Sequence, residues 1–181
     1  MTKQIRTILI AILAMLALNS PAAAQLAVGD KAPVFTTKAA MAGTEFGYSL
    51  AMALRKGPVV LYFYPKAFTH GCTLEANQFA DAMPDFKAAG ATVMGLSNDN
   101  IETLKRFSRE ECRDAFPVGV ASDGLISDYQ VGSEGSRLAS RVSFVISQDG
   151  RVHYVYASAD YRAHVRQTLA SVRGLAKSAA K

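Results

Sequence analysis

The feature that most constrains this fold is an unbroken apolar run, Val59–Tyr64 (VVLYFY), which directly follows Gly57-Pro58. Its β-branched and aromatic residues favour a strand. Apolar and polar residues do not alternate along it, so neither face of the strand can be left to solvent. The run therefore predicts a central strand whose sheet is covered on both sides.

The remainder of the chain supplies the layers that such a strand needs. Gln148-Asp149-Gly150 is a hairpin signal, and Pro84 predicts a kink or a restart inside a helix. Strands alternating with helices, then a hairpin and a last helix, predict one α/β domain over residues 25–181, with a mixed central sheet flanked by helices. We expect strands over 34–38, 44–48, 92–96, 118–121, 141–147 and 151–157, and helices over 50–56, 72–89, 100–112, 124–130 and 161–176.

Residues 1–24 have the pattern of a secretory signal peptide. Lys3 and Arg6 precede the apolar run Ile8–Leu18, and Ala22–Ala24 offers a cleavage site of small residues. The run is shorter than the ~20 residues of a membrane-spanning helix, which disfavours the alternative of an uncleaved anchor. We expect cleavage after Ala24, export to the bacterial periplasm, and no stable membrane association of the mature chain.

The charge pattern does not indicate a nucleic-acid-binding protein, although the formal net charge is +5. The basic residues gather in helix-like segments without interleaved aromatic residues, so we interpret them as solvated helix faces. We expect no cofactor, and the spacing of the histidines predicts no metal site. The basic clusters are Lys105, Arg106 and Arg109, and then Arg162, Arg166 and Arg173.

Cys72, one of only two cysteines, lies where the central strand gives way to a helix. The thiolate is the reactive form of cysteine, and free N–H groups at a helix start favour an anion. The hydroxyl of Thr69 can accept one hydrogen bond and donate another, so it could hold a polar substrate oxygen beside the sulfur. Pro65 ends the strand and would shield the sulfur from solvent. Spacing alone leaves open a second interpretation, a buried structural cysteine.

The segment FYPKAFTHGCTLEA, residues 63–76, resembles the peroxidatic motif of peroxiredoxins, in particular the Q type related to the bacterioferritin comigratory protein, in the alkyl hydroperoxide reductase and thiol-specific antioxidant superfamily. The resemblance extends over most of the mature chain, through GDKAP at 29–33, AAGATVMGLS at 88–97 and RVSFVISQDG at 141–150. It implies a thioredoxin-like fold. It also implies a thiol-dependent peroxidase for hydrogen peroxide and organic hydroperoxides, re-reduced by a thioredoxin-like or small-thiol donor. It favours a monomer, with a weak dimer as the alternative.

The same resemblance assigns roles to individual residues. Cys72 would be the peroxidatic cysteine, which attacks the peroxide and becomes a sulfenic acid. Thr69 would bond the peroxide and the sulfur, and Pro65 would exclude water. Arg141 would stabilise the thiolate and the charge on the leaving oxygen; the alternative is an ordinary surface arginine at a strand end. Glu75 would have at most a supporting role.

Two positions depart from the family pattern. His70 stands where the motif usually has Pro, and we expect it to be an exposed, non-essential residue in a loop, although it could tune the cysteine. A resolving cysteine often follows five residues after the first, where this chain has Asn77, or aligns near Ser108.

Cys112 is one helical turn beyond Ser108, and we interpret it as the resolving cysteine, which would form an intramolecular disulfide with Cys72. Two alternatives stay open. Cys112 could be an inert buried thiol, in which case the enzyme would be of the one-cysteine kind. The two cysteines could instead form a permanent structural disulfide, which would remove the nucleophile.

Two other functions compete with a peroxidase. A thioredoxin-like thiol–disulfide oxidoreductase needs C-x-x-C, but Glu75 occupies the third position after Cys72 and the chain contains no Trp. A non-catalytic scaffold that only senses redox state or binds a partner would have no reason to keep the Pro65, Thr69, Cys72 and Arg141 set.

Overall fold

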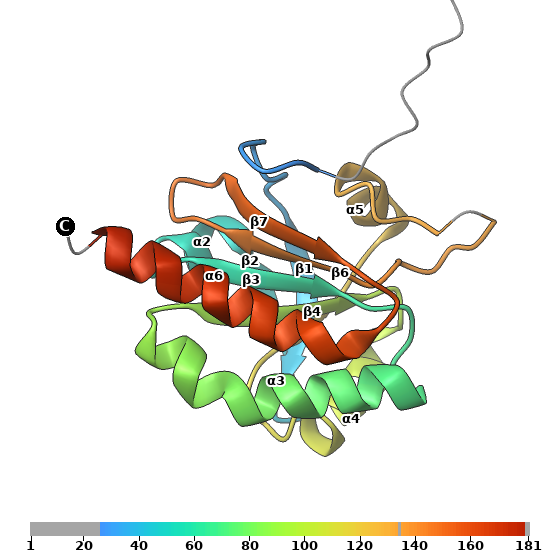
Figure 1. Cartoon of the computed structure of the whole chain (residues 1–181). Coiled ribbons are helices and arrows are strands. Elements are labelled where there is room, and N and C mark those ends of the chain that lie inside the picture. Colours follow the sequence, from blue (N-terminus) through green and yellow to red (C-terminus); the bar gives the residue numbers. More distant parts are fainter. Residues whose placement is uncertain (1–25, 134, 180–181) are drawn as a thin grey trace, which may run out of the picture.

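The computed structural model describes residues 26–133 and 135–179. They form a seven-stranded sheet with helices packed against both faces (Figure 1). The expected signal peptide, residues 1–24, lies outside the described residues. Among the residues that are described, no helix combines the length and the apolar character that crossing a membrane requires.

The sheet has the strand order β2-β1-β5-β4-β3-β6-β7. β3 is parallel to β4 and β4 to β5, whereas all other neighbours are antiparallel, so the predicted mixed α/β sheet is confirmed. The strands are β1 (Thr36–Met41), β2 (Thr44–Ser49), β3 (Val59–Phe63), β4 (Thr92–Ser97), β5 (Val118–Val120), β6 (Val142–Ile146) and β7 (Val152–Ala157). The helices are α2 (Leu50–Leu54), α3 (His70–Ala88), α4 (Ile101–Glu110), α5 (Asp123–Asp128) and α6 (His164–Ala179), with a 3-10 turn η1 (Tyr161–Ala163) before α6.

β3 is the centre of both hydrophobic layers, and every one of its residues is buried. Val59, Leu61 and Phe63 pack in the layer that contains α2 and α5. Val60 and Tyr62 pack in the opposite layer, which contains α3, α4 and α6. This division explains why the strand shows no alternation. α3 and α6 also contact each other, and Figure 1 shows them side by side on one face of the sheet.

α3 begins at His70, two residues before the expected start at Cys72. Thr69 has the extended backbone of an N-cap, with φ −78° and ψ 149°, and therefore ends the preceding loop. The helix continues through Pro84 without the restart that we considered. Its ribbon bends along its length (Figure 1), as expected for a helix containing a residue that lacks an N–H donor.

α4 is shorter than predicted, because it ends at Glu110 and not at Cys112. The next two backbone N–H groups both donate to Phe107 O, at 3.0 Å each, and this closes the helix. Arg113 and Asp114 then adopt left-handed backbone angles, with φ of 51° and 57°. Cys112 therefore lies in the turn after α4, and the expectation that it continues the helix face was wrong.

Candidate active site

The loop between β3 and α3 is held in place by its own residues and by the segment after β4. Ala67 N donates to Asp99 Oδ2 at 2.7 Å, and the Thr69 hydroxyl donates to Lys66 O at 2.8 Å. Phe68 has φ 62°, a left-handed conformation that bulky residues rarely adopt. These contacts fix the point at which the chain turns into α3, and thus the position of the first helical turn.

Cys72 lies in that first turn and is only 1 % exposed. The first bond of the helix runs from Thr73 N to Thr69 O, at 2.9 Å. The amide groups ahead of it have no carbonyl partner within the helix. Their dipoles favour negative charge at this end. A negative sulfur is therefore favoured at Cys72 by the position of the residue in the helix.

Arg141 supplies the second favourable charge. It directly precedes β6, and its Nη2 donates to Cys72 Sγ at 3.4 Å. Its Nη1 donates to Glu75 Oε2 and its Nε to Ala159 O at 3.2 Å, so the guanidinium is held by three partners. Burial would lower the pKa of Arg141, but Glu75 and Cys72 beside it outweigh burial and raise that pKa. Arg141 is therefore a fixed cation, not a surface side chain.

The glycine before the cysteine makes room for this cation. A Cβ atom on Gly71 would lie 3.3 Å from Arg141 Nη2 and 3.6 Å from the Tyr161 ring. The first of these distances is tighter than ordinary packing, so a larger residue would push the guanidinium away from the sulfur.

Glu75 stands one helical turn after Cys72 and is completely buried. Burial raises the pKa of its carboxyl to about 8, although Arg141 acts in the opposite direction. The carboxyl is therefore largely protonated at neutral pH. A neutral Glu75 leaves most of the positive charge of Arg141 to the sulfur.

A hollow of about 600 Å³ opens beside Arg141. Pro65 and Arg141 line it, together with Val142 and Ala157. Thr69 is exposed at the N-terminus of the same helix as Cys72. Its hydroxyl proton is given to Lys66 O, so its oxygen is free to accept a further hydrogen bond.

Cys112 is not bonded to Cys72, although the two thiols lie in the same hydrophobic layer. Cys112 is completely buried, and both cysteines are free thiols. Ser108, at the position that we aligned with the family's resolving cysteine, accepts a hydrogen bond from Gly43 N in the turn between β1 and β2, at 3.0 Å. Burial raises the pKa of the Cys112 thiol, and the neighbouring Glu111 and Asp114 raise it further. In this conformation Cys112 is protonated and enclosed.

The sequence interpretation missed two residues of the site. His164 and Ser143 are fully buried and bonded to each other, and His164 approaches Glu75. A polar residue inside the apolar strand VSFVI was a signal for Ser143, and the spacing of eight residues from His164 to the buried Val172 was a weaker one for His164. His70 is exposed, as expected, but it begins α3 and does not lie in a loop.

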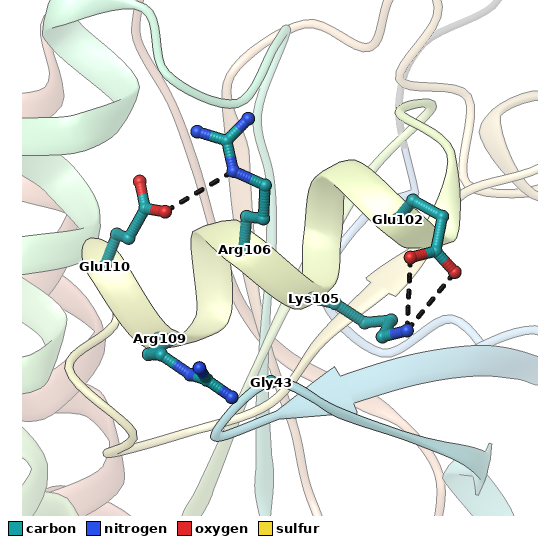
Figure 2. A pocket seen from close by; sticks show the side chains of 6 residues that line it. All are labelled: Gly43, Glu102, Lys105, Arg106, Arg109 and Glu110. Atoms are coloured by element: carbon teal, nitrogen blue, oxygen red, sulfur yellow. Dashed lines mark hydrogen bonds and ion pairs between the residues drawn. The ribbon is translucent and has the colours of Figure 1, made fainter.

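A second hollow, of about 270 Å³, lies between α4 and the turn that contains Gly43 (Figure 2). Lys105 pairs with Glu102 at 3.1 Å and Arg106 with Glu110 at 3.4 Å, which agrees with a solvated helix face. Unlike the first hollow, it is lined by neither Pro65 nor Arg141, and we do not assign the reaction to it.

The sequence is similar to those of known proteins. Residues 28–155 match the AhpC/TSA family. Peroxiredoxin Bcp of Escherichia coli strain K12 is 35% identical over 104 residues, covering 54% of this chain and 67% of that protein. The chloroplastic peroxiredoxin Q of Suaeda salsa is 32% identical over 158 residues, covering 84% of this chain and 70% of that protein.

Solved structures give the same result for the fold. The crystal structure of peroxidoxin BcpB from Mycobacterium tuberculosis superposes with a TM-score of 0.74 at 32% identity, covering 83% of this chain and 98% of that one. A reduced 2-Cys peroxiredoxin of Plasmodium vivax superposes with a TM-score of 0.75 at 21% identity, which speaks for the fold alone. The predicted thioredoxin-like fold is confirmed.

The buried carboxyl predicts a specific pH dependence of stability. The pKa of Glu75 is raised from 4.5 to about 8 on folding, so the folded state holds a proton that the unfolded state has lost. Stability from this group is therefore greatest at low pH and is lost as the pH rises through about 8. In a Cys72→Ser background, which removes the nearby thiol, we compare the protein that keeps Glu75 with the Glu75→Gln protein. The free energy of unfolding of the first should fall relative to that of the second as the pH rises from 4.5 to about 8. Urea unfolding measures it; a constant or opposite difference would contradict the assignment.

Proposed function

This chain belongs to the AhpC/TSA family and is a thiol-dependent peroxidase of the peroxiredoxin kind, and we propose that Cys72 is the residue that carries its reaction. The observation that supports this most is the contact of 3.4 Å between Arg141 Nη2 and Cys72 Sγ, at the start of a helix and out of water. The cation and the helix dipole both favour a negative sulfur.

In the proposed step, the Cys72 thiolate attacks the terminal oxygen of the peroxide. A sulfur–oxygen bond forms as the oxygen–oxygen bond breaks, and the leaving oxygen takes a proton to become water or an alcohol. The sulfur loses two electrons and becomes a sulfenic acid. Arg141 stabilises the charge that develops on the leaving oxygen. We place the approach of the peroxide at the hollow that Pro65 and Arg141 line.

Thr69 and Pro65 have supporting roles in this proposal. The Thr69 oxygen accepts a hydrogen bond from the peroxide O–H, because its own proton is engaged by Lys66 O. Pro65 lies at the wall of the hollow with Arg141 and excludes water from the sulfur. Neither residue forms or breaks a covalent bond in the step. Thr69 orients the peroxide, and Pro65 keeps water out.

For resolution, we propose that Cys112 attacks the Cys72 sulfenic acid, displaces water and forms an intramolecular disulfide, which a thioredoxin-like or small-thiol donor then reduces. The turn that carries Cys112 must open first, because its thiol is enclosed. The side-chain pairs that need to break for this opening are weak. The described pairs between the turn and α3 are Asn77 Nδ2 to Glu111 Oε2 at 3.4 Å, and Arg113 Nη1 to Asp81 Oδ1 at 2.6 Å. Both are at least partly exposed, and such pairs stabilise only weakly.

Without that opening, the protein would be a one-cysteine peroxidase that needs an external thiol. The competing thiol–disulfide oxidoreductase is disfavoured, because the position for a second active-site thiol is the buried Glu75. A scaffold without catalysis is disfavoured, because Arg141, Glu75 and Cys72 form a buried polar group that costs stability and that a passive surface would not need.

We also propose that the protein is exported, with residues 1–24 removed and the mature chain acting as a monomer in the periplasm. Export rests on the sequence pattern of the N-terminus, and the monomer rests on the resemblance to Q-type peroxiredoxins. Mass analysis of protein recovered from the periplasm should give a chain that begins at Gln25. Recovery of the full-length chain from the cytoplasm would contradict the proposal.

One pair of variants tests both cysteines. With hydrogen peroxide and a dithiol donor, Cys72→Ser should consume no peroxide above background, because the nucleophile is gone. After one equivalent of peroxide, wild-type protein should have the mass of an internal disulfide, and Cys112→Ser that of a sulfenic acid. Electrophoresis without reductant and mass spectrometry measure these products.

These measurements test the role of Cys72 and the role of Cys112 separately. A Cys72→Ser protein that still reduces peroxide would refute the assignment of the nucleophile. Wild-type protein that shows only further oxidised Cys72, without an internal bridge, would leave that assignment intact and remove Cys112 from the mechanism.

A further inference from the structure

One carboxylate oxygen fastens the loop between β3 and α3 to the segment after β4. Asp99 Oδ2 accepts a hydrogen bond from Ala67 N at 2.7 Å and a second one from Ser97 Oγ at 2.9 Å. Both donors are enclosed, since Ala67 is 5 % exposed and Ser97 is completely buried. The shorter distance is that of a hydrogen bond from an N–H group to a carboxylate. Asp99 therefore links the end of β4 to a point inside the loop.

The pairing of the central strands brings these two groups together. Phe63 lies opposite Leu96 in the parallel pair of β3 and β4, and Tyr64 N donates to Leu96 O at 3.0 Å. The two chains therefore leave the sheet side by side. The Ala67 N–H and the Asp99 carboxylate meet just beyond this point, so the register of the strands sets their contact.

The helix that follows Asp99 has a cap of its own. The side chain of Asn100 accepts a hydrogen bond from Thr103 N at 2.9 Å, and this bond closes the first turn of α4. The carboxylate of Asp99 is directed away from α4, because its hydrogen bonds with the described residues run to Ser97 and to the loop. Support of the loop is thus the contact that distinguishes Asp99.

The residue after this contact has a backbone conformation that needs support. Phe68 has φ 62°, and the left-handed region is costly for a residue with a Cβ atom. Its ring meets the Phe107 ring edge-on, with centroids 5.2 Å apart, and the guanidinium carbon of Arg106 lies 5.1 Å from its centroid. The Phe68 side chain nevertheless stays 37 % exposed, so packing holds it only in part. The bond to Asp99 fixes the chain immediately before it.

Thr69 is the next residue, and its position depends on the backbone angles of Phe68. The Thr69 carbonyl accepts the first helical bond, from Thr73 N at 2.9 Å, and its hydroxyl donates to Lys66 O at 2.8 Å. The oxygen of this hydroxyl is the acceptor that we proposed for the peroxide O–H. If Phe68 relaxed to a right-handed or extended conformation, the chain would turn and the Thr69 oxygen would move relative to Cys72.

We infer that Asp99 is a positioning residue of the peroxidase reaction. Through Ala67, its carboxylate keeps Phe68 in the left-handed conformation. A left-handed Phe68 in turn holds the Thr69 oxygen where the peroxide meets Cys72. Asp99 touches neither the sulfur nor the peroxide in this role. The cation and the helix dipole that favour a negative sulfur come from other elements. The inference rests on the proposed functions of Cys72 and Thr69.

The first test compares two substitutions of Asp99 in a Cys112→Ser background, in which the sulfenic acid is not resolved. Asp99→Ala removes the acceptor and should lower the rate constant for oxidation of Cys72 by hydrogen peroxide about tenfold, within the range for a displaced orienting group. Asp99→Asn keeps an amide oxygen for both donors and should stay within about threefold of the background. Asp128→Ala is a matched control on an exposed residue.

Stopped-flow measurements in a single turnover give these rate constants, and circular dichroism confirms folding. Equal rate constants for the folded Asp99→Ala and Asp128→Ala proteins would overturn the inference.

A measurement on the sulfur separates positioning of the peroxide from a general disturbance of the site. The ultraviolet absorbance of the Cys72 thiolate at neutral pH should be the same in the Asp99→Ala protein and in the control, because neither Arg141 nor the start of α3 is altered. A general loosening would lower the thiolate signal and the rate together. A loss of thiolate that accounts for the loss of rate would therefore contradict the inference.

A double-mutant cycle shows whether Asp99 acts through the Thr69 hydroxyl. Thr69→Val removes this hydroxyl with little change in side-chain volume. In the Thr69→Val background, Asp99→Ala should lower the rate constant by less than about threefold, because the oxygen that Asp99 places is already gone. An unchanged factor in both backgrounds would contradict the inference.

The last test needs no substitution and applies even if Asp99→Ala does not fold. In reduced wild-type protein, the Ala67 amide should be protected from hydrogen exchange, because it is bonded to Asp99. NMR measures the exchange rate, and exchange as fast as in an unstructured peptide would overturn the inference. Failure of wild-type protein to react with hydrogen peroxide would instead refute the proposed function, so the two failures are distinguishable.

Discussion

The contact between the guanidinium of Arg141 and the sulfur of Cys72 is the interaction on which the site depends. It joins residues that are far apart in the sequence, and the sheet brings them together. β6 pairs with β3 so that Val142 lies opposite Phe63, the last residue of β3. Arg141 therefore stands beside the point where the chain leaves β3 for the loop and α3. The apolar strand that fixes the fold also sets the distance between cation and nucleophile.

The buried carboxyl of Glu75 determines how much of the charge of Arg141 acts on Cys72. A fixed anion at Glu75 would compete with the thiolate for the charge of Arg141. Burial raises the pKa of Glu75 to about 8, which reduces that competition at neutral pH. The closing helix α6 contributes His164, whose low pKa keeps a second cation out of the same space. Enclosure of polar groups is costly, and here it leaves one positive charge close to the sulfur.

Much of the fold could be predicted from local sequence, because buried strands and capped helices leave local patterns. The end of α4 could not, since Arg113 and Asp114 take left-handed angles without a glycine to indicate them. Cys72 was found from its place at a strand–helix junction, but the role of Arg141 came from resemblance to a family. His164 was not predicted, because its relation to Glu75 exists only after α6 has packed against α3.

The most direct test is the rate at which hydrogen peroxide oxidises Cys72 when the cation is removed. Arg141→Gln keeps hydrogen-bond donors but no charge, and Arg137→Gln is a matched control on an exposed residue. The account predicts that Arg141→Gln lowers the single-turnover rate constant by about 100-fold, the scale of one lost electrostatic contact to a transition state, whereas the control stays near wild type. A folded Arg141→Gln protein that reacts within about threefold of wild type would contradict it.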